Sequence, residues 1–295
     1  MSPSSLGSVY ALLTALSWGV AVILFKKSGD FVPPTALNYI KDLIGLILLL
    51  LTFLVMDLEL IQPAPIDEII LLIISGAIGI GIADTILFRS LNLLGASRSA
   101  IVSCLYAPFV VMFSGVLLDE ELSSMMVVGG LLVIAGIVLT ARKRSDPLPR
   151  GQLVEGIFLG VLAEGLMSVC IVAVKPILET HSVLWSTTVR MAGGVVLLTL
   201  LVIGSKALRT QFITALRPNR AWRYAIPGSV VGAYGAILLW IAGFKYTTAM
   251  LASILNQTST LWVVLLAALF LRERLTVTKV FAVGLGFLGS LVVLL

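Results

Sequence analysis

Long stretches without a charged residue dominate this sequence and limit what it can fold into. Residues 99 to 118 and residues 246 to 271 contain no Asp, Glu, Lys or Arg. About 20 apolar residues in a helix, rising about 1.5 Å each, cross the roughly 30 Å hydrocarbon core of a bilayer. Only 12% of the 295 residues are charged, against about 25% in a typical soluble protein. We therefore expect an integral membrane protein.

Ten windows of this length predict an all-α integral membrane protein with ten transmembrane helices. Alternating polar and apolar residues, which are typical of membrane β-barrels, are absent, so helices are favoured. The loops between the windows are short and leave no room for a soluble domain. The windows cover approximately residues 6 to 26, 35 to 56, 68 to 90, 97 to 117, 123 to 141, 153 to 174, 183 to 204, 224 to 244, 249 to 271 and 276 to 295.

The two halves of the chain share a pattern of charged residues. Leu118-Asp-Glu-Glu-Leu122 matches Leu271-Arg-Glu-Arg-Leu275 at an offset of about 153 residues, and Lys26 and Lys41 match Lys175 and Arg190 at an offset of about 149. The sequence thus predicts two repeats, at residues 1 to 145 and 151 to 295. Five spans is an odd number, so the second repeat enters the membrane in the opposite sense and the repeats are inverted.

The distribution of basic residues predicts an orientation. Because loops alternate sides, most of the twenty Lys and Arg residues fall opposite the N-terminus, and only Lys175 and Lys245 fall on its side. The positive-inside rule then places both termini outside an inner (plasma) membrane. The net charge of +5 reflects this topology, and no module for nucleic-acid binding is present.

Metal and cofactor chemistry has little support in the sequence. Cys104 and Cys170 both lie inside predicted spans, and the lone His181 has no partner of a metal-binding pattern. Walker, nucleophile-elbow and HExxH motifs are absent. We expect no cofactor, no metal and no enzymatic activity, and as partners only the lipid bilayer and a small-molecule substrate, in a chain that acts as a monomer or weak homo-oligomer.

The pattern as a whole resembles a known family. Its elements are Ser17-Trp18-Gly19 in the first span, a basic residue early in the second span of each half, and a Leu-x-Glu-x-Leu loop before the last span of each half. They are similar to the drug/metabolite transporter superfamily, EamA-like branch, over the whole chain. The resemblance implies a secondary transporter or exporter of small metabolites such as amino acids. Members of that family usually keep their termini in the cytoplasm, which departs from the orientation predicted here.

Ionisable residues inside the bilayer are expensive and therefore indicate function. Glu164 lies near the middle of the sixth window and Asp84 lies deep in the third. Removal from water favours the neutral form of a carboxyl group, which suits reversible protonation and proton coupling. The alternatives are a permanently neutral Glu164 bonded to a neighbouring helix, and an Asp84 paired with Arg89 or Lys41.

Two intramembrane cations, Lys41 and Arg190, occupy equivalent places in the two halves. Each lies within two turns of the start of its window, so each could bind an anion or extend to the headgroups as a structural lock. Lys41 and Asp42 are adjacent in the sequence and are therefore expected to point to different faces of their helix.

Large polar side chains inside the windows predict a lined cavity. Trp18, Tyr106, Tyr234, Asn256 and Gln257, together with Asp84, are the residues expected to bind the substrate. Ordinary packing between helices through small and hydroxyl residues is the alternative for the Ser and Thr positions nearby. Pro108 is expected to kink the fourth helix beside Tyr106.

The leading hypothesis is a secondary active exporter of small polar metabolites that works by alternating access. Proton coupling through Glu164, with Asp84 second, and facilitated exchange without protons both stay open. The rival is a lipid-linked flippase or membrane enzyme that recognises a phosphorylated headgroup through Lys41 and Arg190. A nonselective channel is disfavoured because rings of charge are missing.

Overall fold

The computed structural model describes residues 3–118, 124–142 and 148–292, and within these ranges the chain is helical and contains no strand. The Asp-Glu-Glu-Leu part of the first repeated loop, residues 119–122, lies outside the described residues. The helices are α1 Pro3–Gly29, α2 Pro34–Val55, α3 Ile66–Gly76, η1 Ala77–Ala83, α4 Asp84–Leu94, α5 Ala96–Ser103, α6 Tyr106–Leu117, α7 Ser124–Arg142, α8 Arg150–Thr180, α9 Val183–Gly204, α10 Lys206–Leu216, α11 Trp222–Gly228, η2 Ser229–Ala236, α12 Ile237–Tyr246, α13 Ala249–Asn256, α14 Ser259–Phe270 and α15 Val277–Val292.

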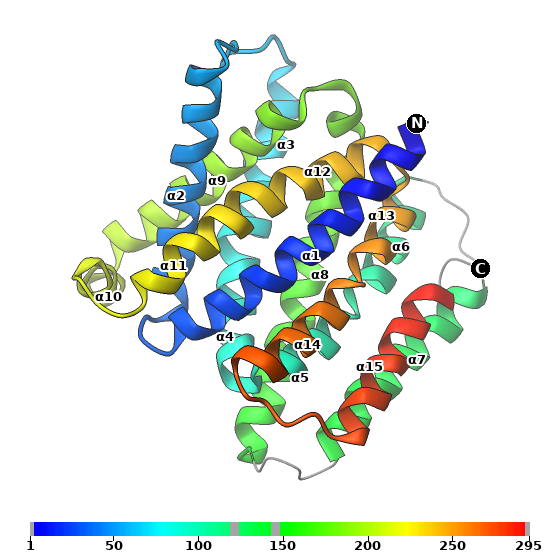
Figure 1. Cartoon of the computed structure of the whole chain (residues 1–295). Helices are drawn as coiled ribbons and strands as arrows, with labels where there is room; N and C mark the ends of the chain where they lie inside the picture. Colours follow the sequence, from blue (N-terminus) through cyan, green and yellow to red (C-terminus); the bar gives the residue numbers. More distant parts are fainter. Residues whose placement is uncertain (1–2, 119–123, 143–147, 293–295) are drawn as a thin grey trace.

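These helices confirm the predicted all-α membrane fold. In the described part of the chain, eight helical segments are long and apolar enough to cross a bilayer. The two remaining windows are occupied by α7 and α15, which pack along each other at one edge of the molecule (Figure 1). Residues 205 to 223 lie between two windows and are therefore expected to form a loop. Helix α10 forms there instead, capped by Ser205. Its Phe212 ring packs 4.6 Å from the Tyr39 ring.

The first helix of each half packs mainly on the other half. Helix α1 lies against α11, η2, α12, α13 and α14, whereas α8 lies against η1, α4, α5 and α6. In Figure 1, α1 crosses the molecule beside α12 and α14. Because the halves interlock in this way, the centre of the molecule is enclosed by helices from both repeats.

The third helix of each half contains a π-helical segment at an equivalent position. Segment η1 separates α3 from α4, and η2 separates α11 from α12. The wider π turn interrupts the regular backbone bonding of a helix, and such segments are common at functional sites. In η1 the carbonyls of Ile80 and Gly81 accept hydrogen bonds from Asn38 Nδ2 at 2.9 and 3.1 Å. The segment therefore exposes backbone oxygens to side chains of α2.

The fourth helix of each half is broken, also at equivalent positions. Helix α5 ends at Ser103 and α6 begins at Tyr106, while α13 ends at Asn256 and α14 begins at Ser259. The predicted kink beside Tyr106 is present, but Pro108 lies in the first turn of α6, where a missing N–H breaks no helical bond. The second half breaks without a proline. Interrupted helices at matching places in two repeats are a feature of transporter binding sites.

A close crossing of α3 and α9 fixes the position of Arg190. A Cβ atom on Gly76 would lie 1.8 Å from the carbonyl oxygen of Arg190, and one on Gly193 would lie 2.2 Å from the carbonyl oxygen of Ile73. Only glycine permits this approach of the two backbones. The crossing brings the start of α9, and with it Arg190, into the centre of the molecule.

Candidate functional site

A cavity of about 120 Å³ lies at the centre of the helical bundle. The first helices of the two halves contribute equivalent positions to it. Ala15 and Trp18 of α1 line the cavity, and so do Glu164 and Met167, which occupy the corresponding positions of α8 at the offset of about 149 residues. The two first helices therefore line the cavity through equivalent positions, although the residues at these positions differ.

The second, third and fourth helices continue the same correspondence. Lys41 and Arg190 face the cavity from α2 and α9, and the broken fourth helices add Ser103 and Tyr106 on one side and Asn256, Gln257 and Ser259 on the other. The third helices contribute from and around their π-helical segments. Their lining residues are Gly79, Ile80, Asp84 and Leu87 in the first half and Gly232, Ala233, Ala236, Ile237 and Trp240 in the second.

The structure brings most of the residues chosen from the sequence into this one cavity. Trp18, Lys41, Asp84, Tyr106, Glu164, Arg190, Asn256 and Gln257 all line it. Tyr234 does not, which corrects its expected place. Its hydroxyl lies 2.7 Å from Thr52 Oγ1 of α2, whereas Gly232, Ala233 and Ala236 of the same segment line the cavity.

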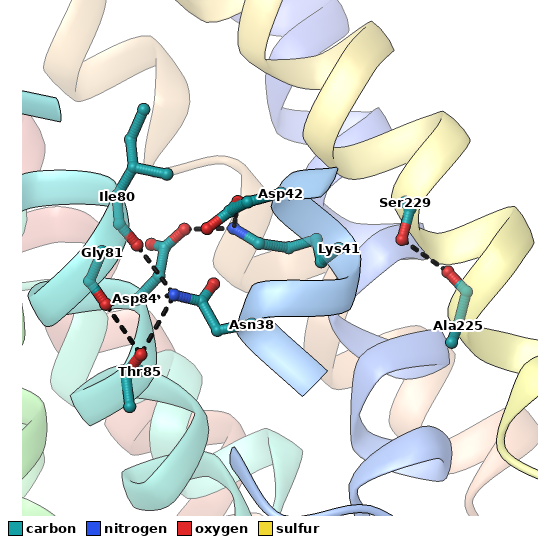
Figure 2. Close-up of polar contacts among 9 residues, drawn as sticks. All are labelled: Asn38, Lys41, Asp42, Ile80, Gly81, Asp84, Thr85, Ala225 and Ser229. Atoms are coloured by element: carbon teal, nitrogen blue, oxygen red, sulfur yellow. Dashed lines mark hydrogen bonds and ion pairs between the residues drawn. The ribbon is translucent and has the colours of Figure 1, made fainter. Parts of the chain in front are cut away.

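The cation of the first half is held by two carboxylates. Lys41, only 3% exposed, lies with its Nζ 2.9 Å from Asp42 Oδ1 and also forms an ion pair and hydrogen bond with Asp84 (Figure 2). The expectation that Lys41 and Asp42 diverge is wrong, since the flexible lysine stem turns back toward its neighbour. Arg89 pairs instead with Glu155 at the surface. Lys41 neither extends to the headgroups nor has a free charge.

The cation of the second half has no such partner. Arg190 is 1% exposed, and in the described part of the chain its Nε and Nη1 atoms make no hydrogen bond and no carboxylate lies within ion-pair distance. Its guanidinium carbon lies 5.4 Å from the centre of the Trp240 ring. A cation over an aromatic face gains some electrostatic stabilisation, but the two unpaired nitrogens leave strong donors for an anion.

Trp240 is a site residue that the sequence analysis missed. Its indole nitrogen donates to the Tyr106 hydroxyl at 3.2 Å, and the bond joins α12 of the second half to α6 of the first. The sequence does contain a signal for it, since Trp240 is a large side chain with a polar N–H inside a predicted span. It lies six residues after Tyr234, which was predicted to bind the substrate. The Tyr106–Trp240 pair forms a rigid aromatic wall against which Arg190 rests.

Glu164 and the broken helices supply the remaining polar groups. Glu164 is 4% exposed and accepts a hydrogen bond from the Ser103 hydroxyl. Gln257 donates through Nε2 to the carbonyl oxygen of Ser103 at 3.2 Å, which joins the two breaks. Both polar atoms of the Asn256 amide are buried without a partner in the structure. Asn256 thus leaves one donor and one acceptor for a bound molecule.

A second, smaller cavity of about 30 Å³ adjoins the central one. Trp18, Leu87, Ser103 and Ser259 line both cavities. The smaller cavity continues along α1 past Val22, in the direction of the end of α1 at Gly29. Trp18 and Leu87 are therefore the side chains placed between the centre and that side of the bundle.

Apolar helices long enough to cross a bilayer, with buried charged and polar side chains around a central cavity, define an integral membrane protein with an internal site. Comparisons with known proteins agree. The model of the EamA-like transporter family matches residues 5–142 and again residues 154–295. This chain belongs to the EamA-like transporter family, as its resemblance to the drug/metabolite transporter superfamily implied.

The other comparisons support the fold. Twenty-eight chains of solved structures match. One of them, titled "Crystal structure of protein", is 19% identical, covers 98% of this chain and 98% of its own length, and superposes with a TM-score of 0.72. At that identity the likeness concerns the architecture alone. No curated protein matches the sequence.

Proposed function

We propose that this protein exports small zwitterionic metabolites, amino acids foremost, across an inner membrane by alternating access. The observation that carries the proposal is the unpaired Arg190 guanidinium in the same central cavity as Glu164. An amino acid carries a carboxylate and an ammonium group, and these are complementary to a guanidinium and a carboxylate. The planar guanidinium binds a carboxylate through two parallel hydrogen bonds.

The size and walls of the cavity support a ligand of this class. An engineered cavity of about 150 Å³ in another protein binds benzene, so a volume of about 120 Å³ suits a molecule with few heavy atoms. The Trp18 ring offers a face to an ammonium group. The two unpartnered amide atoms of Asn256 offer further hydrogen bonds.

Alternating access fits the symmetry of the site. In inverted-repeat transporters one bundle rocks against the other around a central site formed by interrupted helices. Here the matching breaks at Ser103–Tyr106 and Asn256–Ser259 line that site. The small cavity beyond Trp18 marks the route toward the side that carries most basic residues, which is the cytoplasm by the positive-inside rule.

Proton coupling is assigned to Glu164, with Asp84 second. Within the described residues Glu164 has no cation at ion-pair distance, so its charge is balanced only when it holds a proton or when a substrate ammonium lies beside it. Arrival of the substrate therefore releases the proton, and loss of the substrate takes it up again. Asp84 pairs with Lys41 and exchanges its proton only when that pair opens.

A thermal-shift screen of the purified protein tests the proposal, because a ligand that binds the folded state stabilises it. We expect stabilisation by amino acids and not by the matched amines or carboxylic acids that lack one of the two groups. Arg190→Gln should weaken binding by about 30-fold or more, the usual effect of removing one partner of a buried charge pair. Arg209→Gln, on exposed α10, is the matched control.

The rival headgroup hypothesis predicts the opposite ligand profile. It needs both Lys41 and Arg190 for a phosphate, yet Lys41 is already paired with Asp42 and Asp84. Stabilisation by phosphoethanolamine or glycerol phosphate, with no response to amino acids, would replace the exporter with a flippase or headgroup enzyme.

A further inference from the structure

The polar cluster beside the cavity contains more hydrogen-bond acceptors than donors. Four buried oxygen atoms have no hydrogen-bond partner: Asn38 Oδ1, both carboxyl oxygens of Asp42, and Asp84 Oδ1. Asp42 Oδ1 does lie 2.9 Å from Lys41 Nζ, with which it forms an ion pair. Asn38 and Asp42 are fully buried, so bulk solvent does not reach these atoms.

The orientation of the Asn38 amide is fixed by its surroundings. Its nitrogen donates to the carbonyls of Ile80 and Gly81 and to Thr85 Oγ1, at 2.9, 3.1 and 3.0 Å (Figure 2). Exchange of the nitrogen and oxygen would break both bonds to carbonyl oxygens, which cannot donate, so the amide nitrogen faces η1 and Asn38 Oδ1 is left as a free acceptor. Asn38 and Asp42 are one turn apart on the same face of α2. Asp42 therefore lies on the side of α2 from which a donor to Asn38 Oδ1 can come.

The charge of the cluster points to the same missing group. The Lys41 ammonium faces the carboxyl groups of Asp42 and Asp84. If both carboxyl groups are ionised, one negative charge in the membrane interior is left uncompensated. Arg190, the other cation of the cavity, forms no ion pair with Asp42 or Asp84 in the described residues and does not supply the missing charge within this cluster. One added positive charge that is also a donor satisfies both requirements.

No other buried charge reaches Asp42 from the helices packed against α2 in the described residues. Helix α4 brings Asp84, and its Arg89 is paired with Glu155 at the surface. Helix α9 brings Arg190, which forms no ion pair with either aspartate in the described residues. Segment η1 brings no titratable group, and η2 brings Tyr234, which is bound to Thr52. The remaining groups lie toward the helix ends: Lys26 and Lys27 of α1, Lys206 and Arg209 of α10, and Arg223 and Tyr224 of α11.

We propose that Asp42 holds a proton, as a carboxylic acid that donates to Asn38 Oδ1, next to an ionised Lys41–Asp84 pair. A metal cation such as Na⁺ fits less well, because it would lie against the Lys41 ammonium and be repelled by it. Asp84 and Lys41 line the cavity whereas Asp42 does not. A proton that moves between Asp42 and the cavity therefore passes through the Lys41–Asp84 pair.

This proton site belongs to the first half alone. The positions equivalent to Asn38, Asp42 and Asp84 in the second half are Thr187, Met191 and Ala236, none of which titrates. The repeat thus places a cation in each half but surrounds only Lys41 with carboxyl groups. The first half holds a proton and the second half keeps Arg190 available for an anion, and the proton site stands whatever substrate the cavity binds.

Infrared spectroscopy of the protein in liposomes, with and without ¹³C-carboxyl aspartate labelling, tests the proposal without a transport assay. At neutral pH we expect a protonated carboxyl band that shifts on aspartate labelling, which separates it from any band of Glu164. Asp42→Asn and Asp84→Asn should each remove it, because each leaves one carboxylate to balance Lys41. Lys41→Met should keep or strengthen it, and Glu164→Gln should leave it unchanged.

The variants also guard against misfolding. Asn and Asp are nearly isosteric, so Asp42→Asn and Asp84→Asn should fold like the wild-type protein. Lys41→Met is the control, because it disturbs the same cluster but should retain the band. Absence of an aspartate-labelled acid band from the wild-type protein contradicts the proposal. A band that appears only when Na⁺ is removed also contradicts it, since the cluster would then bind the metal cation.

Discussion

Replacement of the two equivalent cations should change stability in opposite directions. Arg190 is buried with two guanidinium nitrogens unpaired, and an unsatisfied buried polar group costs about 1 to 3 kcal/mol, or more if charged. Arg190→Met keeps the long side chain and removes the charge. We therefore expect the free energy of unfolding to rise by about 1 to 3 kcal/mol.

Lys41→Met should do the reverse, because it leaves Asp42 and Asp84 buried without their ammonium partner. Removal of one member of a buried ion pair costs about 3 to 5 kcal/mol. Uptake of a second proton by the two carboxyl groups limits the loss to the lower end of that range. At about 2 °C per kcal/mol for a chain of this size, Arg190→Met should raise the melting temperature by about 2 to 6 °C and Lys41→Met should lower it by about 6 °C.

Differential scanning fluorimetry in detergent, repeated by tryptophan fluorescence in liposomes, measures both shifts. A loss of stability in Arg190→Met as large as that in Lys41→Met would refute the reasoning, since Arg190 would then have a partner comparable to the carboxylates around Lys41. Arg209→Met, at an exposed position of α10, should change the melting temperature little.

Three further predictions follow from the site, the packing and the topology. Glu164→Gln should weaken amino-acid binding, because the substrate ammonium loses its carboxylate partner, and any flux that remains in proteoliposomes should no longer depend on a pH gradient; unchanged gradient-driven flux would remove Glu164 from the coupling step. Gly76→Ala should destabilise the protein by about 1 to 3 kcal/mol or more, because its Cβ would overlap the Arg190 carbonyl, whereas Gly151→Ala, with open space around the new Cβ, should be neutral or slightly stabilising. A reporter fused to the C-terminus and active only in the cytoplasm should stay silent. Reporter activity would show that the orientation is opposite to the one predicted.

The sequence alone was sufficient to predict the membrane-spanning helices, because hydropathy is a local property, but it did not predict the polar helix α10. Each of the ten windows coincides with a helical segment, and the equivalence of Lys41 with Arg190 was visible from their spacing. Residues with charge or large polar groups in the interior, such as Glu164 and Asn256, also reached the cavity as expected, because few other environments satisfy them in a membrane.

Details that depend on helix rotation could not be predicted in this way. Tyr234 lies on a face of η2 that contacts α2 rather than the cavity, and which face of a span is turned to the cavity depends on packing rather than on a local sequence signal. The same limit applies to the contact of Lys41 with Asp42, which depends on where α4 places Asp84. The different states of Lys41 and Arg190 are visible only once their neighbours are known.

The central claim is that Arg190 binds the carboxylate of a transported amino acid. Counterflow tests it most directly: proteoliposomes are loaded with an unlabelled mixture of the proteinogenic amino acids and diluted into a ¹⁴C-labelled mixture. We predict transient accumulation of label by the wild-type protein and by Arg209→Gln, and none by Arg190→Gln. Equal accumulation by Arg190→Gln, or none by the wild-type protein, would contradict the claim.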